Sequence, residues 1–253
     1  MENTLIRTQL MKRKKDKILV LDNIDEISAF ALDRYRALAS ENITQRGRFI
    51  VAFSGGRTPA IFMQKLATKK ELPWQDTHIF IADERFVSFA DESSNYRMIK
   101  QNLLSKIDIP AKNIHPIYTG YKDVNTAAQK YAIYIRDFFG LGENQMPVFD
   151  LVMLGLGADG HTASLFPQLE EINKNRLTIA ADIQEVQHQR ISLSLGAVNN
   201  AREIIFLISG KEKADIVKRV VKGKDEKLPA ARVSSEKGSI YFLIDRPAAK
   251  FIL

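Results

Sequence analysis

The chain has 253 residues, of which 45% are hydrophobic and 26% charged, and its formal net charge is +7. This composition is ordinary for a soluble globular protein, and the length suits one large domain or two small ones. The absence of cysteine excludes disulfides, thiolate metal ligands and a cysteine nucleophile, and it suits the cytoplasm, where we expect the protein. No apolar run approaches the roughly 18 residues of a membrane-spanning helix, and the first residues lack the apolar core of a secretory signal.

The positive charge admits two interpretations. Binding of nucleic acid would need basic residues gathered on one face, together with side chains that read a groove. The dense basic cluster of this sequence lies within residues 12–17, and elsewhere lysines and arginines alternate with acids. We therefore expect no nucleic-acid partner and no membrane contact, and we expect a positive field that attracts a small anionic substrate.

From residue 17 onward, short apolar runs typical of buried strands alternate with amphipathic stretches typical of helices. Strands are predicted over 17–21, 49–53, 78–82, 114–117, 149–154, 177–183, 190–195, 203–209 and 240–244. Helices are predicted over 23–40, 60–67, 94–104, 125–139, 197–201 and 212–221. No repeat or linker divides them, so we expect a basic polar segment over 1–16 and one α/β domain over 17–253 with a mostly parallel sheet.

Four strand ends carry residues suited to chemistry, because ligands of open α/β sheets bind beyond the carboxyl ends of strands. The first is Ser54-Gly55-Gly56-Arg57-Thr58-Pro59, between a strand and a helix. Adjacent glycines let backbone N–H groups converge on an anion, the helix N-terminus adds its dipole, and Ser54 and Thr58 offer hydroxyls. The spacing fits neither a Walker loop nor a dinucleotide motif, and a tight turn that merely needs glycine is an equal alternative.

The second strand end is Asp83-Glu84-Arg85. Three charged residues directly after an apolar strand are rarely buried without partners. Arg85 is suited to clamp a phosphate or carboxylate with two hydrogen bonds. The alternative is a surface cluster of salt bridges, which these three residues alone would favour.

The third strand end is Asp159-Gly160-His161. An imidazole has an ordinary pKa of about 6.5, which suits proton transfer near neutral pH. A neighbouring carboxylate such as that of Asp159 fixes the tautomer of the ring and stabilises the imidazolium. A loop histidine packed for structure is the alternative. Of the remaining histidines, His78 and His115 are expected to be structural, and His188 is expected to be solvated.

The fourth candidate combines Arg190 with Lys213, which falls in the first turn of a predicted helix. The helix dipole disfavours a cation there unless a bound anion faces it. A lysine that reaches into water is the commoner case for any one lysine. We expect no metal, because the sequence has no HExxH pattern, no paired-histidine spacing and no acidic triplet with ligand spacing.

Taken together, these stretches resemble one family, the 6-phosphogluconolactonases. The resemblance runs from about Ile18 to Ala249, and the order of the motifs at strand ends makes it specific although each motif alone is weak. Two departures, Ser88 and Gly196, replace prolines common in that family without removing a reactive group. The motifs are SGGRTP (54–59), DERFV (83–87), SNYRM (94–98), GLGADGHTASLFP (155–167), NA (200–201), GKEK (210–213), LPA (228–230) and LIDR (243–246).

The resemblance implies a modified Rossmann-like three-layer α/β sandwich. It also implies a cofactor-free hydrolase that opens 6-phospho-D-glucono-1,5-lactone to 6-phosphogluconate in the oxidative pentose phosphate route. On this hypothesis His161 is the general base that activates water, and Asp159 orients it. Backbone N–H groups of the glycine turns or Arg85 would stabilise the oxyanion. The substrate and its phosphate would be bound by Ser54, Gly55, Gly56, Thr58, Arg85, Arg190 and Lys213.

Two alternative functions belong to the same superfamily or fold. Glucosamine-6-phosphate isomerase/deaminase has a similar motif that ends in Phe-Asn-Glu-Pro, and its glutamate assists ring opening. Here Phe166 precedes Pro167 and cannot move protons, and Arg85 stands where the deaminase has tyrosine. A non-catalytic sugar-phosphate sensor is the other alternative, and the presence of both Asp159 and His161 argues against it.

Overall fold

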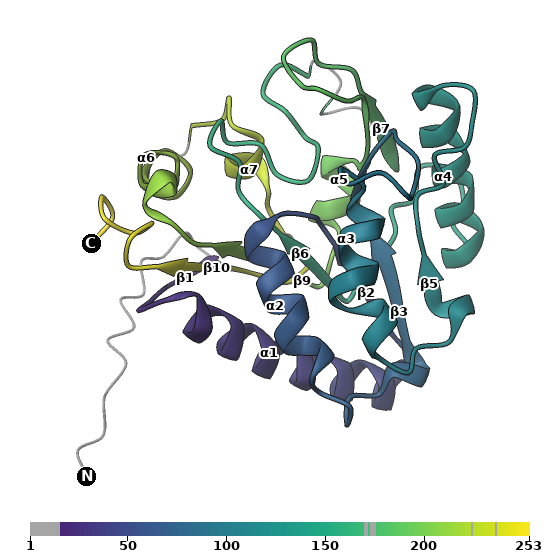
Figure 1. Ribbon diagram of the computed structural model, residues 1–253, viewed down its shortest axis with the longest axis horizontal. Coiled ribbons are helices and arrows are strands. Elements are labelled where there is room, and N and C mark those ends of the chain that lie inside the picture. The colour runs from purple at the N-terminus through teal and green to yellow at the C-terminus, as the bar shows by residue number, and fades with distance from the viewer. Residues whose placement is uncertain (1–15, 170–171, 173–175, 224, 236) are drawn as a thin grey trace.

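The structure is a computed structural model that describes residues 16–169, 172, 176–223, 225–235 and 237–253 (Figure 1). In this part of the chain, seven parallel strands form one sheet in the order β1-β10-β9-β6-β2-β3-β5. They are β1 (Asp16–Leu21), β2 (Phe49–Phe53), β3 (Thr77–Ile81), β5 (Ile114–His115), β6 (Leu151–Leu154), β9 (Glu203–Ile208) and β10 (Ser239–Asp245). The predicted basic segment over 1–16 lies outside the described residues except for Asp16, which begins β1.

Helices cover both faces of this sheet. The first three crossovers step from β1 toward β5, and the later ones step back toward β1. Because such crossovers are right-handed, the two groups of helices lie on opposite faces. Figure 1 shows α1, α2 and α3 together, and α2 packs against both of its neighbours. The helices are α1 (Ile24–Arg46), α2 (Arg57–Ala67), α3 (Asn95–Asn102), α4 (Val124–Phe139), α5 (Leu195–Asn199), α6 (Ala214–Val217) and α7 (Pro229–Arg232).

The central strands are buried along their whole length. Every residue of β2 (FIVAF), β6 (LVML) and β9 (EIIFLI) is buried. These strands read as continuous apolar runs because helices cover the sheet on both sides. The predicted fold, an α/β three-layer sandwich around a mostly parallel sheet, is confirmed.

Three further strands form a small antiparallel sheet that the apolar pattern did not predict as a separate unit. Its order is β4 (Asp83–Arg85), β8 (Arg190–Leu193) and β7 (Thr178–Ala181). The predicted strands over 177–183 and 190–195 become β7 and β8 in shorter form. The charged triad 83–85 is itself a strand, and the buried carboxylate of Glu84 accepts the backbone N–H groups of Asn95 and Tyr96 at the start of α3. The sequence did not predict this strand because the partner of Glu84, the start of α3, is distant in the chain, and a local pattern cannot show such a contact.

Two helical segments differ from the prediction. Helix α1 continues past residue 40 and ends before Gly47, whose φ of 71° suits a glycine cap. The segment predicted as one helix over 212–221 is divided into a 3₁₀ turn (Lys211–Lys213), α6 and a π-helical turn (Lys218–Lys222). Valine and isoleucine are frequent in this segment, and their branched side chains lower the preference for a regular helix.

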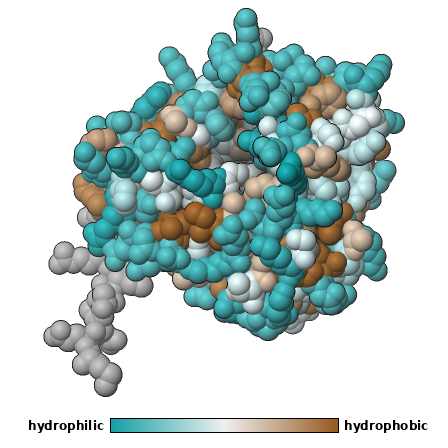
Figure 2. Space-filling model, viewed as in Figure 1, coloured by the Kyte–Doolittle hydropathy of each residue, from teal (hydrophilic) through white to brown (hydrophobic). Residues whose placement is uncertain are grey.

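The neighbouring strands β2 and β6 mark the point at which the chain reverses its direction across the sheet. The chain leaves β2 over one face and β6 over the other, so their carboxyl ends border a crevice. The loops after these strands are two of the predicted candidate stretches. Figure 2 shows a mostly hydrophilic surface on this side of the molecule, with pale residues in a hollow near its centre. Within the described residues, no helix is both long enough and apolar enough to cross a membrane.

Candidate active site

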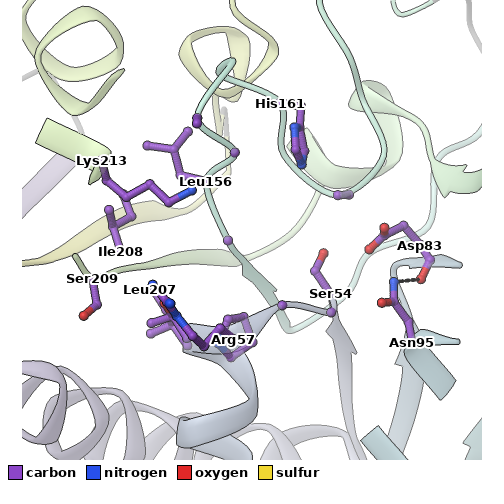
Figure 3. A pocket seen from close by; sticks show the side chains of 18 of the residues that line it. Ser54, Arg57, Asp83, Asn95, Leu156, His161, Leu207, Ile208, Ser209 and Lys213 are labelled. Atoms are coloured by element: carbon purple, nitrogen blue, oxygen red, sulfur yellow. Dashed lines mark hydrogen bonds between the residues drawn. The ribbon is translucent and has the colours of Figure 1, made fainter. Parts of the chain in front are cut away.

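A cavity of about 400 Å³ opens at the crevice between β2 and β6, a size that suits a small molecule. Its walls come from the loop after β2, the turn after β6, the segment after β9, strand β4 and the start of α3. Figure 3 shows how these segments surround one space. The predicted site residues that line it are Ser54, Gly55, Gly56, Thr58, Arg85, His161 and Lys213. The other two do not line the cavity: Asp159 contacts His161, and Arg190 lies on β8 opposite Arg85.

His161 and Asp159 form a hydrogen-bonded pair at this cavity. The imidazole Nδ1 lies 2.5 Å from Asp159 Oδ1, which also accepts the backbone N–H of His161 at 3.1 Å. An ionised carboxylate can only accept a hydrogen bond, so in the neutral ring Nδ1 carries the proton and the lone pair is on Nε2. Burial raises the pKa of Asp159, but the hydrogen bond and charge of His161 outweigh burial and hold that pKa below its ordinary value. The pair thus offers Nε2 as a base beside a carboxylate that stays ionised.

The turn that carries this pair depends on a glycine and on packing from a distant segment. A Cβ on Gly157 would lie 2.1 Å from His161 Nδ1, so a larger residue would displace the ring. The Gly157 N–H donates to the carbonyl of His161 at 2.8 Å. The side chain of Leu228 lies against Gly160, and the Ala230 N–H donates to the Gly160 carbonyl at 3.1 Å. These contacts give the LPA motif a structural role, since it supports the turn of His161 from outside.

One side of the cavity has the features of an anion site. Gly56, with a φ of 115°, directly precedes α2, and Thr58 lies in the first turn of that helix. Backbone N–H groups at a helix N-terminus favour an anion. Lys213 comes from the 3₁₀ turn after β9, and Figure 3 shows its side chain extending toward Leu156. Arg57, which was not predicted as a site residue, also lines the cavity and pairs with Glu212 at 2.6 Å.

Two arginines lie opposite each other on neighbouring strands of the small antiparallel sheet. Arg85 on β4 stands opposite Arg190 on β8, and Arg85 Nη1 donates to the Ser93 carbonyl at 2.6 Å. Burial, together with the charge of Arg85, lowers the pKa of Arg190 to about 10. Because two like charges lie close together, an anion near them would relieve their repulsion. Arg190 therefore adds positive charge beside the cavity without forming part of its wall.

Asp83 and Asn95 line the cavity although neither was among the predicted site residues. Both lie inside motifs of the sequence, where Asp83 is one of three consecutive charged residues. Asn95 is the first residue of α3 and reaches the site because the Glu84 carboxylate binds its backbone N–H. Burial raises the pKa of Glu84 although four hydrogen bonds oppose the increase, and this carboxylate acts as the structural anchor of α3.

The other three histidines do not line the cavity. His78 on β3 and His115 on β5 are hydrogen-bonded through their rings at 3.0 Å and stack among aromatic side chains, apart from the residues that line the cavity. His188 lies on the segment before β8, and the expectation that it is solvated is wrong, because the side chain is half-buried and its Nε2 is buried. In the described ranges, no group of three or more histidine, aspartate and glutamate side chains is placed to hold a metal ion.

The parallel sheet, with a cavity between β2 and β6 where the chain reverses its direction, defines an α/β protein with a small-molecule site. A family model described as glucosamine-6-phosphate isomerases/6-phosphogluconolactonase matches residues 22–242. The chain belongs to this family.

Individual relatives agree with the family assignment over most of the chain. A 6-phosphogluconolactonase of Synechocystis is 35% identical, over 82% of this chain and 86% of the relative. A 6-phosphogluconolactonase of Nostoc is 33% identical, over 92% of this chain and 97% of the relative. The crystal structure of 6-phosphogluconolactonase from Thermotoga maritima superposes with a TM-score of 0.80 at 32% identity, over 92% of this chain and all of that one.

Proposed function

We propose that this protein is a 6-phosphogluconolactonase that hydrolyses 6-phospho-D-glucono-1,5-lactone to 6-phosphogluconate in the oxidative pentose phosphate pathway. The observation that carries the proposal is the Asp159–His161 pair on a cavity that also holds Lys213 and a helix N-terminus. Relatives that bear this name and match the chain over most of their length support the same reaction. A lactone carbonyl is already electrophilic, so a positioned base and anion-binding groups are sufficient to catalyse its hydrolysis.

In the proposed mechanism, Nε2 of His161 takes a proton from a water molecule as the water oxygen attacks C1 of the lactone. The bond between C1 and the ring oxygen then breaks, and the imidazolium returns its proton to that oxygen. The new carboxylic acid ionises, so each turnover releases one proton to solvent. Asp159 orients the ring and offsets the imidazolium charge. A base held in this way contributes a rate factor of about 10²–10⁴.

The phosphate of the substrate is assigned to the anion side of the cavity. Backbone N–H groups at Gly55, Gly56 and the start of α2 would donate to it, and Thr58 and Lys213 would add a hydroxyl and a positive charge. Arg85 and Arg190 provide further positive field, and Arg85 or the glycine turns donate to the oxyanion. Binding energy from the phosphate then fixes C1 against His161, which converts affinity for a remote group into orientation of the reacting one.

Phe166 favours hydrolysis over the deaminase reaction of the same superfamily. It occupies the position of the glutamate that assists ring opening in the deaminase, and a phenyl ring has no group that can donate or accept a proton. Direct assays separate the two activities, because the deaminase releases ammonia from glucosamine 6-phosphate and the lactonase does not.

The decisive experiment generates the lactone in situ and measures proton release above the spontaneous rate. We expect the wild type to accelerate hydrolysis and His161→Ala to lose a factor of about 10²–10⁴ in kcat, with a smaller change in KM. His188→Ala, which removes an imidazole outside the cavity lining, is the matched control and should retain turnover.

Two results would contradict the proposal in different ways. Near-wild-type kcat in His161→Ala would refute the assignment of the base while leaving the activity in place. A wild-type protein that binds 6-phosphogluconate but leaves lactone decay at its spontaneous rate would instead be a sensor.

A further inference from the structure

Three side chains in one wall of the cavity each bury a polar atom that has no hydrogen-bond partner within the described residues. The atoms are the hydroxyl Oγ of Ser54, Oδ1 of Asp83 and Oδ1 of Asn95. All three residues line the cavity and are buried, with exposed fractions of 3%, 5% and 1%. A buried polar group without a partner is destabilising, and a cluster of such groups in one wall indicates a ligand that supplies the missing bonds.

The wall is held in place before any ligand arrives. Asn95 Nδ2 donates to the backbone carbonyl of Asp83 at 2.7 Å, drawn as a dashed line in Figure 3, which leaves its amide oxygen as the unpaired atom. The hydroxyl of Ser164 donates to Asp83 Oδ2 at 2.8 Å, so Oδ1 is the free carboxylate oxygen. A Cβ on Gly55 would lie 2.0 Å from Asn95 Oδ1, so glycine is what lets this amide reach the loop after β2.

The chemistry of the three atoms specifies the kind of group that binds them. Two are acceptors, and the third, a hydroxyl, both donates and accepts. The partner must therefore supply hydrogen-bond donors. A phosphate is unsuitable because it would face the Asp83 carboxylate, whereas neighbouring hydroxyl groups of a sugar would satisfy all three atoms at once. The cavity thus has an anion side at Lys213 and a separate wall for uncharged hydroxyls.

We propose that Ser54, Asp83 and Asn95 form a hydroxyl-recognition wall that selects a polyhydroxylated sugar lactone over a deoxygenated one. The inference rests on the proposed function, because the sugar lactone is the ligand assigned to this cavity. An analogue without hydroxyls leaves the buried acceptors unpaired, and sites of this kind discriminate strongly against such analogues.

The test compares two stable ligands that carry the same charged ends. One is 6-phosphogluconate, and the other is 6-phosphooxyhexanoate, which has the phosphate and the carboxylate but no hydroxyl groups. Dissociation constants come from calorimetric titration of the full chain. We expect the wild type to prefer 6-phosphogluconate by about 100-fold, which corresponds to about fivefold for each of three hydrogen bonds.

Variants then assign the preference to the wall. Ser54→Ala, and Asp83→Asn, which replaces the carboxylate by an amide, should each reduce the ratio of the two dissociation constants about fivefold. Lys213→Ala should weaken both ligands and leave the ratio unchanged. Ser209→Ala is the matched control, since this hydroxyl lines the same cavity but is already bonded to Asp245 at 2.5 Å, and it should not change the ratio either.

Thermal stability of the free protein gives a second readout that does not depend on binding. Ser54→Ala removes a buried hydroxyl that has no partner, so the free protein should melt at a temperature equal to or above that of the wild type. If the wild type bound the two ligands with similar dissociation constants, or if both Ser54→Ala and Asp83→Asn left the ratio of these constants unchanged, the hydroxyl-recognition wall would be refuted. Lactone hydrolysis would persist in that case, so the proposed function would stand. A wild type that binds neither ligand and does not hydrolyse the lactone would overturn the proposed function itself.

Discussion

The ring of Phe166 lies against the imidazole of His161, with 4.7 Å between the ring centroids and 43° between their planes. Phe166 is buried and belongs to a small apolar cluster with Ala181 and Ile183 beside the antiparallel sheet. The ring of His161 is therefore held on one side by Asp159 and on another by Phe166. From the sequence, Phe166 mattered only because it was not a glutamate, whereas the structure gives it a positioning role.

Shortening Phe166 should lower turnover more than affinity. Phe166→Ala removes the surface on which the imidazole rests, and a displacement of about 1 Å at a catalytic group can cost a factor of about 100 in rate. We expect kcat to fall about 10- to 100-fold with a small change in KM. Phe166→Leu keeps part of the contact and should recover most of the loss. If the two variants lost kcat to the same extent and also melted at the same lowered temperature, the role of Phe166 would be purely structural.

Replacement of Asp159 by asparagine should have a larger effect than loss of Phe166. The amide retains the shape of the side chain, but it can donate to Nδ1 and so place the proton on the wrong nitrogen. We expect Asp159→Asn to lose a factor of about 10²–10⁴ in kcat. Asp33→Asn, which changes an aspartate exposed on α1, is the matched control and should retain the rate. Similar kinetics for the two variants would show that Asp159 does not orient the base.

A methyl group at position 157 tests the geometry of the same pair from the backbone side. The Cβ of Gly157→Ala would lie 2.1 Å from His161 Nδ1 and 2.6 Å from Asp159 Oδ1, so at least one of these side chains must move. We expect kcat to fall at least about 10-fold while the protein stays folded. In Gly142→Ala the nearest side-chain atom is 3.6 Å from the new Cβ, and this control should retain activity. A fully active Gly157→Ala would show that the observed pairing is unnecessary.

The central sheet could be predicted because the parallel strands are covered on both faces. Continuous apolar runs such as β2 and β9 are typical of strands buried in this way, and the glycines and polar residues that end them mark the edge where ligands bind. For the same reason most of the predicted site residues line one cavity. His161 and Lys213 come together although 52 positions separate them, because β6 and β9 are neighbours in the sheet.

What the sequence did not predict depends on contacts between distant residues. β4 is a strand because its backbone pairs with β8, and its Glu84 can be buried because it binds the start of α3. An apolar pattern cannot show a charged residue with such partners. Asn95 faces the cavity because of that same contact. The position of Arg190 follows from the register of β8 on β4, which places it opposite Arg85, beside the cavity but outside its lining. In each case the local residues permit several positions, and packing selects one.

The acid stability of the fold should depend on His115. This ring stacks on Phe80, with 4.1 Å between centroids, and its Nδ1 lies 2.5 Å from the hydroxyl of Tyr134. Burial, followed by the charge of His78, lowers the pKa of His115 to about 3, and burial also lowers the pKa of His78. In the unfolded chain a histidine titrates near its ordinary pKa of about 6.5. The unfolded state therefore binds more protons between these two values, so the contribution of His115 to stability is complete above about pH 6.5 and declines as the pH falls toward 3.

His115→Gln removes this titration together with the stacking contact. At pH 7 we expect the variant to melt at a lower temperature than the wild type, because it loses the ring that packs on Phe80. As the pH falls from 7 to 4 the difference in melting temperature should narrow, by on the order of 5 °C, since the wild type alone loses the contribution of His115. The carboxylates titrate alike in both proteins and cancel in this difference. Melting curves at pH 7, 6, 5 and 4 would check the prediction, and a constant difference across them would mean that His115 is protonated in the folded protein as readily as in the unfolded chain.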